Sequence, residues 1–377
     1  MPIGVLHVCD KFGVAGSSIH GVSRLFSWWF PRYDRDRFEV SLVGLKRAEP
    51  ASDLLRQQGI AVHHLGRGKF DPRIVGDLVS LARARHTRIL HVHGYAAADF
   101  GRIAARRVGA KLVLHEHFAD PRMPRYQAVA DRLLANFTDR AIAVSASTRD
   151  FLVRERFVPE SRVRLIWNGA PLDEFGAGST DAARALRREL GLRDVDLVIG
   201  IVGRLSAQKD HRTLLDAAAR LFPAVPEARL LIVGDGDLLP ALRSQAQALG
   251  IADRVVFAGH RSDIPTVLAA LDVFCIASTY EGTPLALFEA MAAGRAIVST
   301  AVDGCREVLE DGVTGLLAPP ADPAALAEAL RRVAVAPDLR ARLADSAQKA
   351  SLRYDIRECV RQMEALYDEV LGARDAA

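Results

Sequence analysis

The stretch Ser278–Gly294, which reads STYEGTPLALFEAMAAG, follows a short apolar run at Val273–Ala277. The run is short and sharply bounded, as expected for a buried strand of a parallel sheet. A helix is expected to begin at Pro284, because a proline at the first helical position gives up no hydrogen bond, and Gly294 is expected to end it. The stretch therefore predicts a strand, a loop and a helix in succession.

Two glutamates flank the predicted N-terminus of this helix, Glu281 in the loop before it and Glu289 about one and a half turns inside it. The free backbone N–H groups of the first turn, around Leu285 and Ala286, carry a partial positive charge and suit a phosphate group. Carboxylates on either side accept hydrogen bonds from ribose and sugar hydroxyls. The arrangement predicts a nucleotide-sugar site; in the alternative interpretation, both glutamates only cap the helix or lie on the surface.

These residues are similar to the signature of the family 4 retaining glycosyltransferases, E-G-x-P-x-x-x-x-E-A, with Glu281, Gly282, Pro284, Glu289 and Ala290 at the fixed positions. The similarity continues in the family's order through nearly all of the second half of the chain. The further motifs are GRLSAQKD at 203–210, GDG at 234–236, FAGHRSDI at 257–264, Gly304 with Glu307, and DGVTGLLAPP at 311–320. An ordered set of this kind is far more specific than one pair of glutamates.

The resemblance implies the GT-B fold, in which two Rossmann-like, doubly wound α/β domains face each other across a cleft. It implies an N-terminal acceptor-binding domain at residues 1–172 and a C-terminal donor-binding domain at 173–354. A last helix at 355–371 is expected to cross back and brace the first domain. The sequence itself supports this boundary, because a turn at Asn168 and Gly169 leads into a segment rich in glycine and polar residues.

Alternating strand and helix signals independently predict doubly wound parallel sheets. The strands expected in the first half are 3–8, 38–43, 60–65, 89–93, 111–115, 140–144 and 163–167. Those expected in the second half are 197–202, 229–233, 254–257, 273–277, 296–300 and one beginning near 315. Helices are expected from about 21, at 72–83 and 97–107, and from about 181, 210 and 322.

Two cations, Arg204 and Lys209, follow the strand expected at 197–202, and their place at its carboxyl end favours phosphate binding over a pair of solvated charges. A glycine-bearing loop after the first strand lets backbone approach a phosphate, and the resemblance implies that Gly16 there faces the donor diphosphate. It also implies that Glu289 holds the ribose and Glu281 the transferred sugar. The expected donor-binding residues are Gly16, Arg204, Lys209, Glu281, Gly282, Thr283, Leu285, Ala286 and Glu289.

Two strand ends carry histidine pairs, His91 with His93 and His115 with His117, and the period of a strand places both members of a pair on one face. Such pairs could begin the metal site of a hydrolase, but no further histidine and carboxylate set is spaced to complete the ligands, so no metal is expected. Their place at the carboxyl ends of parallel strands suits ligand binding instead. The resemblance implies that His117 lies near the reacting sugar, with His115 as the alternative.

Composition sets broad limits on partners and location. The four cysteines are far apart and are expected to be core thiols. No apolar run is long enough for a membrane span and the first residues lack a signal-peptide pattern, so a cytoplasmic protein is expected. Residues 1–172 carry 27 Lys and Arg against 16 Asp and Glu, a net charge of +11, whereas the remainder carries 23 against 30, a net charge of −7. The basic half suggests an anionic acceptor or membrane surface, unless its charge is simply solvated; nucleic acid is not expected.

Two aromatic residues, Trp28 and Phe30, fall off the apolar face of the helix expected from about residue 21. Lying beside Arg24 and Arg32, they could form an acceptor platform or a membrane-dipping edge, but packing in the core is the favoured interpretation. The remaining apolar residues of this helix are expected in the core.

The predicted reaction is transfer of a hexosyl or N-acetylhexosaminyl group, with retention, from a UDP or GDP sugar to a glycan, lipid-linked or small-molecule hydroxyl. Neither metal nor cofactor is expected, because His117, Glu281, Arg204 and Lys209, with the helix N-terminus, form the predicted catalytic set. The resemblance implies a front-face route in which the departing phosphate assists deprotonation of the acceptor. The alternatives are an inactive binding protein of the same fold, an epimerase, and a phosphorylase, which would need pyridoxal phosphate.

Overall fold

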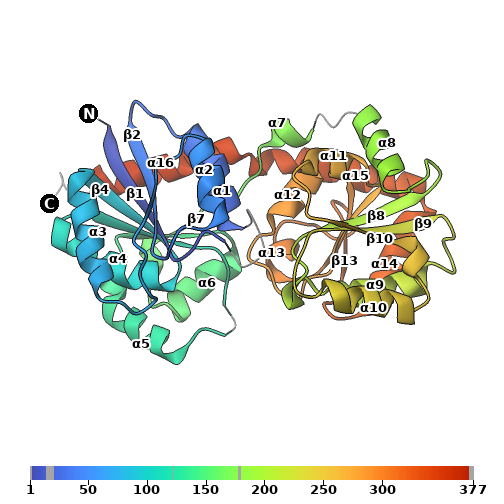
Figure 1. The fold of residues 1–377 in the computed structure, drawn as a ribbon, viewed down its shortest axis with the longest axis horizontal. Helices are drawn as coiled ribbons and strands as arrows, with labels where there is room; N and C mark the ends of the chain where they lie inside the picture. The colour runs from blue at the N-terminus through green and yellow to red at the C-terminus, as the bar shows by residue number, and fades with distance from the viewer. Residues whose placement is uncertain (1, 14–20, 121, 177–179, 373–377) are drawn as a thin grey trace. The chain divides into compact units, whose positions relative to one another are not determined.

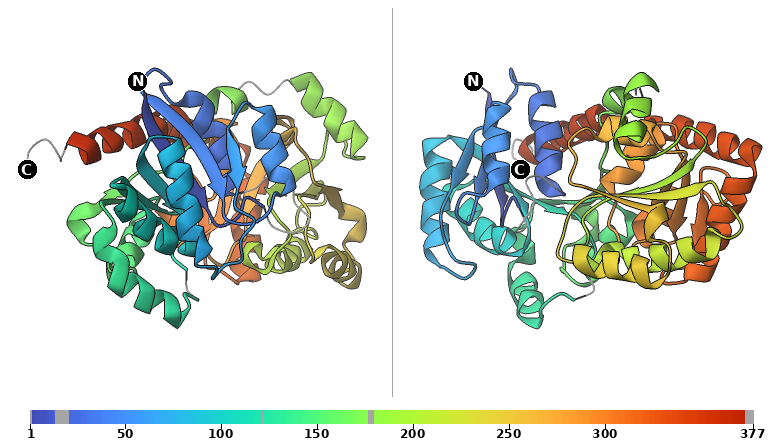
Figure 2. Two further views of the ribbon diagram at one scale, coloured as in Figure 1. Left: turned by 60° about the vertical axis from the view of Figure 1, so that its left-hand side comes forward. Right: turned by 45° about the vertical axis from the view of Figure 1, so that its right-hand side comes forward.

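The computed structural model describes residues 2–13, 21–120, 122–176 and 180–372, which form two compact units (Figure 1). The first unit comprises the described residues of Met1–Asn168 and Ile356–Ala377, and the second comprises those of Gly169–Asp355. In each unit, helices cover both faces of one parallel sheet (Figures 1 and 2). Each unit is therefore a doubly wound α/β domain.

The sheet of the first unit has seven strands in the order β3-β2-β1-β4-β5-β6-β7. The strands are β1 Ile3–Cys9, β2 Phe38–Gly44, β3 Val62–His64, β4 Thr87–His93, β5 Lys111–Glu116, β6 Arg140–Ala143 and β7 Val163–Leu165. The chain winds outward in both directions from the β1/β4 pair, which is the switch point where sheets of this kind bind ligands. Apolar residues such as Leu6, Leu90 and Leu112 from these central strands form the core.

The helices of this unit are α1 Val22–Trp29, α2 Pro50–Gln57, α3 Arg73–Ala84, α4 Tyr95–Val108, α5 Arg125–Leu134, α6 Ala146–Arg154 and α16 Ile356–Gly372. Single 3-10 turns are η1 Phe30–Arg32, η2 Ala135–Phe137 and η3 Glu160–Arg162. Trp28 and Phe30 are buried, as the packing interpretation expected.

A buried ion network lies between the helices of the first unit. Asp131 on α5 is fully buried and accepts hydrogen bonds from Arg102 Nη1 at 2.5 Å and from Arg156 Nε at 2.8 Å. Arg156 also pairs with Glu116 at the end of β5. Each of these charges has a partner, which is the condition under which charged groups are tolerated in a protein interior.

The sheet of the second unit has six strands in the order β10-β9-β8-β11-β12-β13. The strands are β8 Leu197–Val202, β9 Ala228–Val233, β10 Val255–Gly259, β11 Val273–Ile276, β12 Ala296–Thr300 and β13 Leu316–Ala318. The helices are α7 Leu172–Phe175, α8 Thr180–Glu189, α9 His211–Leu221, α10 Leu239–Ala248, α11 Ile264–Ala269, α12 Leu285–Ala292, α13 Asp303–Arg306, α14 Pro323–Val335 and α15 Pro337–Ser351. The 3-10 turns are η4 Ala207–Lys209, η5 Ala252–Arg254 and η6 Leu352–Tyr354.

The helix expected from the opening stretch begins one residue later than predicted. Pro284 is the N-cap of α12, with φ −71° and ψ 119°, so its backbone is extended and Leu285 is the first helical residue. Gly294 follows the helix with a φ of +63°, in the left-handed region that glycine adopts without strain. No helix among the described residues has both the length and the apolar character needed to cross a membrane.

Candidate functional site

The candidate donor site lies at the carboxyl edge of the second sheet, in the loops that follow β8, β9 and β11. These strands are neighbours, and the winding direction reverses between β8 and β11. The loop after β8 carries Arg204 and Lys209, and the loop after β11 carries Glu281. Sequence motifs separated by more than seventy residues therefore meet at one switch point, where ligands bind to open α/β sheets.

Glu281 is held by three side-chain donors. Its Oε1 accepts hydrogen bonds from Lys209 Nζ at 2.5 Å and from Ser278 Oγ at 2.7 Å, and its Oε2 accepts one from Gln208 Nε2 at 3.3 Å. The backbone joins the same loops, because Thr279 N donates to Gln208 O at 2.9 Å. The carboxylate and the ammonium group are thereby fixed in a pair that can meet a hydroxyl and a phosphate together.

Arg204 contributes a second cation to this edge of the sheet. It is half-buried, and its guanidinium has no hydrogen-bond or ion-pair partner within the described ranges. A guanidinium offers a planar fork of N–H donors that matches phosphate oxygens. Among the predicted cations of the site, Lys209 is thus engaged by a carboxylate, whereas Arg204 remains available to an anion.

Close packing of backbone explains the glycines around these cations. Gly234, which follows β9, has a φ of +142°, and a Cβ there would overlap the carbonyl oxygen of Gly203. A Cβ at Gly304 would overlap the carbonyl oxygen of Gly282 in the same way. These contacts let the loops after neighbouring strands pack directly against one another.

The N-terminus of α12 has no side-chain cap, and its first two residues, Leu285 and Ala286, are half-exposed. Their backbone N–H groups precede the first intrahelical hydrogen bonds, so an anion can satisfy them. Gly282 and Thr283 are buried. Glu289 is fully buried within the helix, with an exposed fraction of 0 %.

Histidines form a second cluster, in the first unit. The predicted residues His91, His93, His115 and His117 lie together, and His7 on β1 joins them. His7 is a histidine that the sequence interpretation did not include in this set. His7 lies more than eighty residues from His91, and only the pairing of β1 with β4 makes them neighbours. The one local sign of His7 in the sequence was that it stands as a single polar residue within an otherwise apolar strand.

This cluster includes two groups of three histidines whose ligand-capable atoms lie within 4.8 Å of one another. The groups are His7, His91 and His93, and His93, His115 and His117. Burial lowers the pKa of His7 and of His117 to about 3, and those of the other three histidines well below the usual range. All five imidazoles are therefore neutral at physiological pH. The remaining predicted residue, Gly16, lies outside the described residues.

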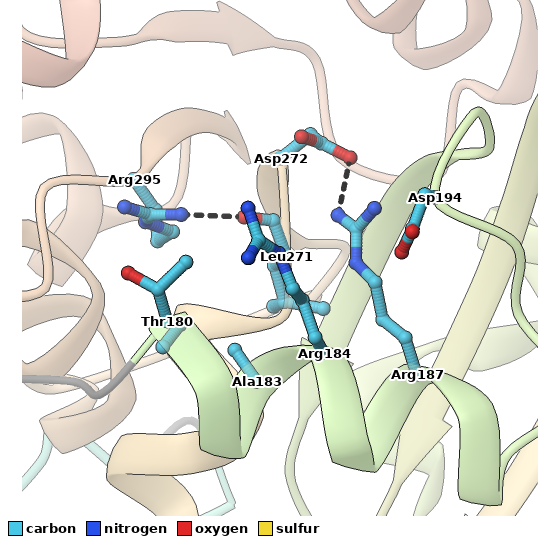
Figure 3. A pocket seen from close by; sticks show the side chains of 9 residues that line it. Thr180, Ala183, Arg184, Arg187, Asp194, Leu271, Asp272 and Arg295 are labelled. Atoms are coloured by element: carbon cyan, nitrogen blue, oxygen red, sulfur yellow. Dashed lines mark hydrogen bonds and ion pairs between the residues drawn. The ribbon is translucent and has the colours of Figure 1, made fainter.

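A separate cavity of about 550 Å³ lies at the opposite, amino edge of the second sheet (Figure 3). Its arginines are already engaged: Arg187 pairs with Asp272 at 2.8 Å, and Arg295 Nη1 donates to Leu271 O at 2.7 Å. Asp272 and Arg295 immediately precede β11 and β12. The cavity therefore lies away from the predicted donor residues of the second unit.

Comparisons with known proteins identify the class. The model of the family described as "Glycosyl transferases group 1" matches residues 183–350, and that of "Glycosyltransferase Family 4" matches residues 21–174. Alpha-D-kanosaminyltransferase of Streptomyces kanamyceticus is 30% identical over 291 residues, which cover 73% of this chain and 75% of that protein. UDP-Gal:alpha-D-GlcNAc-diphosphoundecaprenol alpha-1,3-galactosyltransferase of Escherichia coli is 28% identical, over 79% of this chain and 81% of that protein.

Among solved structures, Anabaena HepE in complex with UDP superposes with a TM-score of 0.84 and 25% identity, covering 97% of this chain and 100% of that one. Sucrose-phosphate synthase from Thermosynechococcus elongatus gives a TM-score of 0.80 at 20% identity, covering 98% of this chain and 99% of that one. The two sheets and these superpositions define the GT-B fold, and the two family models define a glycosyltransferase. The chain belongs to the family 4 retaining glycosyltransferases, as the resemblance of its motifs implied.

Proposed function

We propose that this enzyme transfers a hexosyl group, with retention, from a UDP sugar to a hydroxyl of a lipid-linked glycan, using the second unit to bind the donor and the first to bind the acceptor. The observation that carries the proposal is that the Lys209–Glu281 pair and Arg204 lie in loops at the same edge of the sheet, next to the N-terminus of α12. This edge combines two cations and uncapped backbone N–H groups for a diphosphate with a fixed carboxylate for sugar hydroxyls.

Two relatives support the choice of base. The solved structure at 25% identity is a complex with UDP, and the name of the E. coli relative includes UDP-Gal. The name of that relative also includes a diphosphoundecaprenol-linked sugar, which is the basis for a lipid-linked acceptor here. GDP, the other base that the sequence left open, has no comparable support.

The charges at the donor site fit the proposed reaction. The bond between the anomeric carbon and the diphosphate oxygen breaks, and its electron pair stays on the departing phosphate. Arg204, Lys209 and the N–H groups of Leu285 and Ala286 would stabilise that negative charge. The acceptor oxygen forms a new bond on the same face of the sugar and passes its proton to the departing phosphate. In this scheme Glu281 holds sugar hydroxyls, Glu289 acts on the ribose, and His117 contacts the transferred sugar.

An exposed apolar face on α5 supports a membrane surface as the location of the acceptor. Tyr126, Val129 and Leu133 follow one another at helical spacing and are exposed, Val129 to 61% and Leu133 to 72%. Phe70 extends the face, because its ring packs edge-to-face on Tyr126 at 5.6 Å and is itself exposed. Large apolar side chains gathered in this way mark an interaction surface.

Exposed cations surround that face. Lys69 Nζ donates to the Tyr126 hydroxyl at 2.8 Å and lies 5.5 Å from the Phe70 ring. Arg122, Arg125 and Arg132 are exposed on α5 or just before it. Basic residues beside an apolar helix face are typical of proteins that bind anionic lipid at the bilayer interface.

The donor is tested with purified protein and UDP, GDP, ADP and TDP sugars, without added metal, by following nucleotide release and thermal stability together. UDP-sugar breakdown is expected to exceed that of the other donors. A ligand at about a hundred times its Kd should stabilise the protein by roughly 2.7 kcal/mol. Preferential release of GDP, ADP or TDP would contradict the proposed donor.

The membrane surface is tested by sedimentation with vesicles of phosphatidylcholine alone and with added phosphatidylglycerol. Binding is expected only with the anionic lipid, and the double variant Val129→Ser/Leu133→Ser should lose it. The matched control is Val195→Ser/Leu352→Ser, which removes the same residue types at exposures of 72% and 71% in the second unit. Equal binding by the two double variants would contradict α5 as the membrane surface.

A further inference from the structure

The histidine cluster is a hydrogen-bonded network rather than a loose group of rings. In the parallel sheet of the first unit, His7 on β1 is in register with His91 on β4, and His93 on β4 is in register with His115 on β5. His117 follows β5 by one residue. The side chains lie on one face of the sheet, because residues two apart in a strand point the same way.

Specific nitrogens join these rings in two branches. In the first, His117 Nε2 lies 3.0 Å from His93 Nδ1, and His93 Nε2 lies 3.1 Å from His7 Nδ1. In the second, His115 Nδ1 lies 3.1 Å from His91 Nε2. His93, in the middle of the first branch, therefore uses both of its ring nitrogens.

The two branches meet at the hydroxyl of Tyr367, which α16 brings from the far end of the chain. The hydroxyl oxygen lies 2.5 Å from His91 Nδ1 and 3.4 Å from His7 Nε2. Tyr33 O–H lies 3.1 Å from the same oxygen and has no hydrogen bond to a histidine within the described part of the chain. Tyr367 thus links five histidines into one chain of hydrogen bonds, which runs His117, His93, His7, Tyr367, His91, His115.

A neutral imidazole has one N–H donor and one acceptor nitrogen. A ring that accepts a hydrogen bond at one nitrogen must therefore donate at the other, so the direction of one bond fixes the direction of the next. The short contact to His91 suits an O–H donor, whereas the longer contact to His7 suits an N–H that donates to the hydroxyl oxygen. His7 then accepts from His93, and His93 accepts from His117. On the other side, His91 donates to His115.

We propose that Tyr367 is a positioning residue whose single hydroxyl proton sets the tautomers of all five histidines. The network then presents His117 Nδ1 as an acceptor and His115 Nε2 as a donor. Both nitrogens lack a hydrogen-bond partner in the described chain, and the two rings stack at 4.5 Å. The assignment rests on the proposed function for its link to catalysis, because His117 is the residue proposed to contact the sugar.

The geometry favours this network over a bound metal ion. Ring nitrogens that share a tetrahedral zinc aim their lone pairs at the ion, with Zn–N distances of about 2.0 Å. Here the nitrogens of each pair satisfy hydrogen-bond geometry toward each other at 3.0 to 3.1 Å. Metal binding at these histidines is the competing interpretation, and the experiment below includes a measurement that would detect it.

The test compares wild type with Tyr367→Phe and Tyr33→Phe by ¹⁵N NMR of histidine-labelled protein, together with steady-state kinetics. Wild type is expected to show His117 protonated on Nε2 and His115 protonated on Nε2. Tyr367→Phe should give mixed tautomers at His117 and lower kcat by roughly 10- to 100-fold with little change in donor KM, by analogy with the loss of a hydrogen-bond partner that orients a metal-bound histidine. Tyr33→Phe, which removes an equally buried hydroxyl, should keep the wild-type tautomers.

Unchanged tautomers in Tyr367→Phe would overturn the assignment, as would protonation of His117 on Nδ1 in wild type. Loss of the histidine N–H signals on adding one equivalent of Zn²⁺, with a rise in Tm, would overturn it in favour of a metal site. The NMR result does not depend on catalysis. If the protein showed the expected tautomers but transferred no sugar from a UDP sugar, the result would support the network and contradict the proposed function.

Discussion

Lys209 Nζ and Glu281 Oε1 lie 2.5 Å apart although 72 residues separate them in the chain. The pair joins the loop after β8 to the loop after β11 and is mostly shielded from water, with side-chain exposures of 22% and 7%. A bound phosphate would compete with Glu281 for the ammonium group. We therefore expect the pair to hold the Lys209 ammonium group in place until a donor binds.

Lys209→Ala is expected to lower kcat/KM by about 10² to 10³, since it removes one stabilising group from the departing phosphate. Glu281 keeps its hydrogen bonds from Ser278 and Gln208, so the variant should stay folded and lose about 1 to 3 kcal/mol of unfolding free energy. The measurement is UDP release at varied donor concentration, alongside urea denaturation. Lys349→Ala, which breaks a surface pair with Asp345, is the control and should leave both quantities unchanged. If Lys209→Ala lost activity only because much of the protein was unfolded under the assay conditions, the role of Lys209 at the departing phosphate would be contradicted.

Arg204→Ala is expected to weaken donor use severely and leave the fold intact, because its guanidinium contacts no carboxylate that would be left unpaired within the described residues. Arg204→Lys should recover only part of the activity, since a point charge does not reproduce the two parallel bonds of a guanidinium. Isothermal titration with UDP measures the effect directly. Arg331→Ala, at an exposed pair with Glu328, provides the matched control. If Arg204→Ala bound UDP with wild-type affinity, the assignment of Arg204 to the donor site would be wrong.

Glu289→Gln should raise donor KM or lower kcat strongly while the protein stays folded. The substitution keeps the size of a fully buried side chain and removes its charge, so packing in α12 is preserved. Circular dichroism and thermal unfolding check the fold, and donor kinetics check the role. Normal turnover by the folded variant would show that this glutamate is only part of the core.

Asp131→Asn should destabilise the first unit by about 3 to 5 kcal/mol, because Arg102 and Arg156 would remain buried without their shared carboxylate. The loss is measured by urea denaturation. Asp345→Asn, which breaks an exposed pair, should cost less than about 0.5 kcal/mol. Equal effects of the two substitutions would mean that the buried network contributes no more than a surface pair.

The buried histidines should make stability fall as the pH drops. Their pKa values are lowered in the folded protein, to about 3 for His7 and His117, while an unfolded histidine titrates near 6.5. Below pH 6.5 the unfolded chain therefore binds more protons, so each such histidine costs up to about 1.4 kcal/mol per pH unit. Asp99, whose pKa burial raises to about 6, titrates in the opposite sense and offsets only part of this loss.

The measurement is the free energy of unfolding at pH 8, 7, 6 and 5. Stability should be constant above about pH 7 and decline below it. His7→Asn should decline less steeply, and His86→Asn, at an exposed position whose φ of 46° asparagine tolerates, should decline like wild type. Stability that is flat down to pH 5 would contradict neutral histidines in the core.

Local signals in the sequence were enough for the strands, for several helices and for the class of enzyme. The strands 197–202 and 296–300 were predicted with the observed bounds, and the other expected strands lie within about two residues of those in the structure. These signals depend on residues close together in the chain: apolar runs make strands, and proline and glycine mark where helices start and stop. The ordered motifs of the second half likewise identified the family before the fold was known.

Only the tertiary structure decided which distant residues touch. The order of the strands brings Lys209 to Glu281 and His7 to His91, and α16 brings Tyr367 to the histidines. No local pattern encodes strand order, register or the docking of a terminal helix, because these depend on contacts between segments far apart in the chain. For the same reason the sequence predicted the charged residues of the candidate donor site, whereas their pairing and the histidine network followed from the fold.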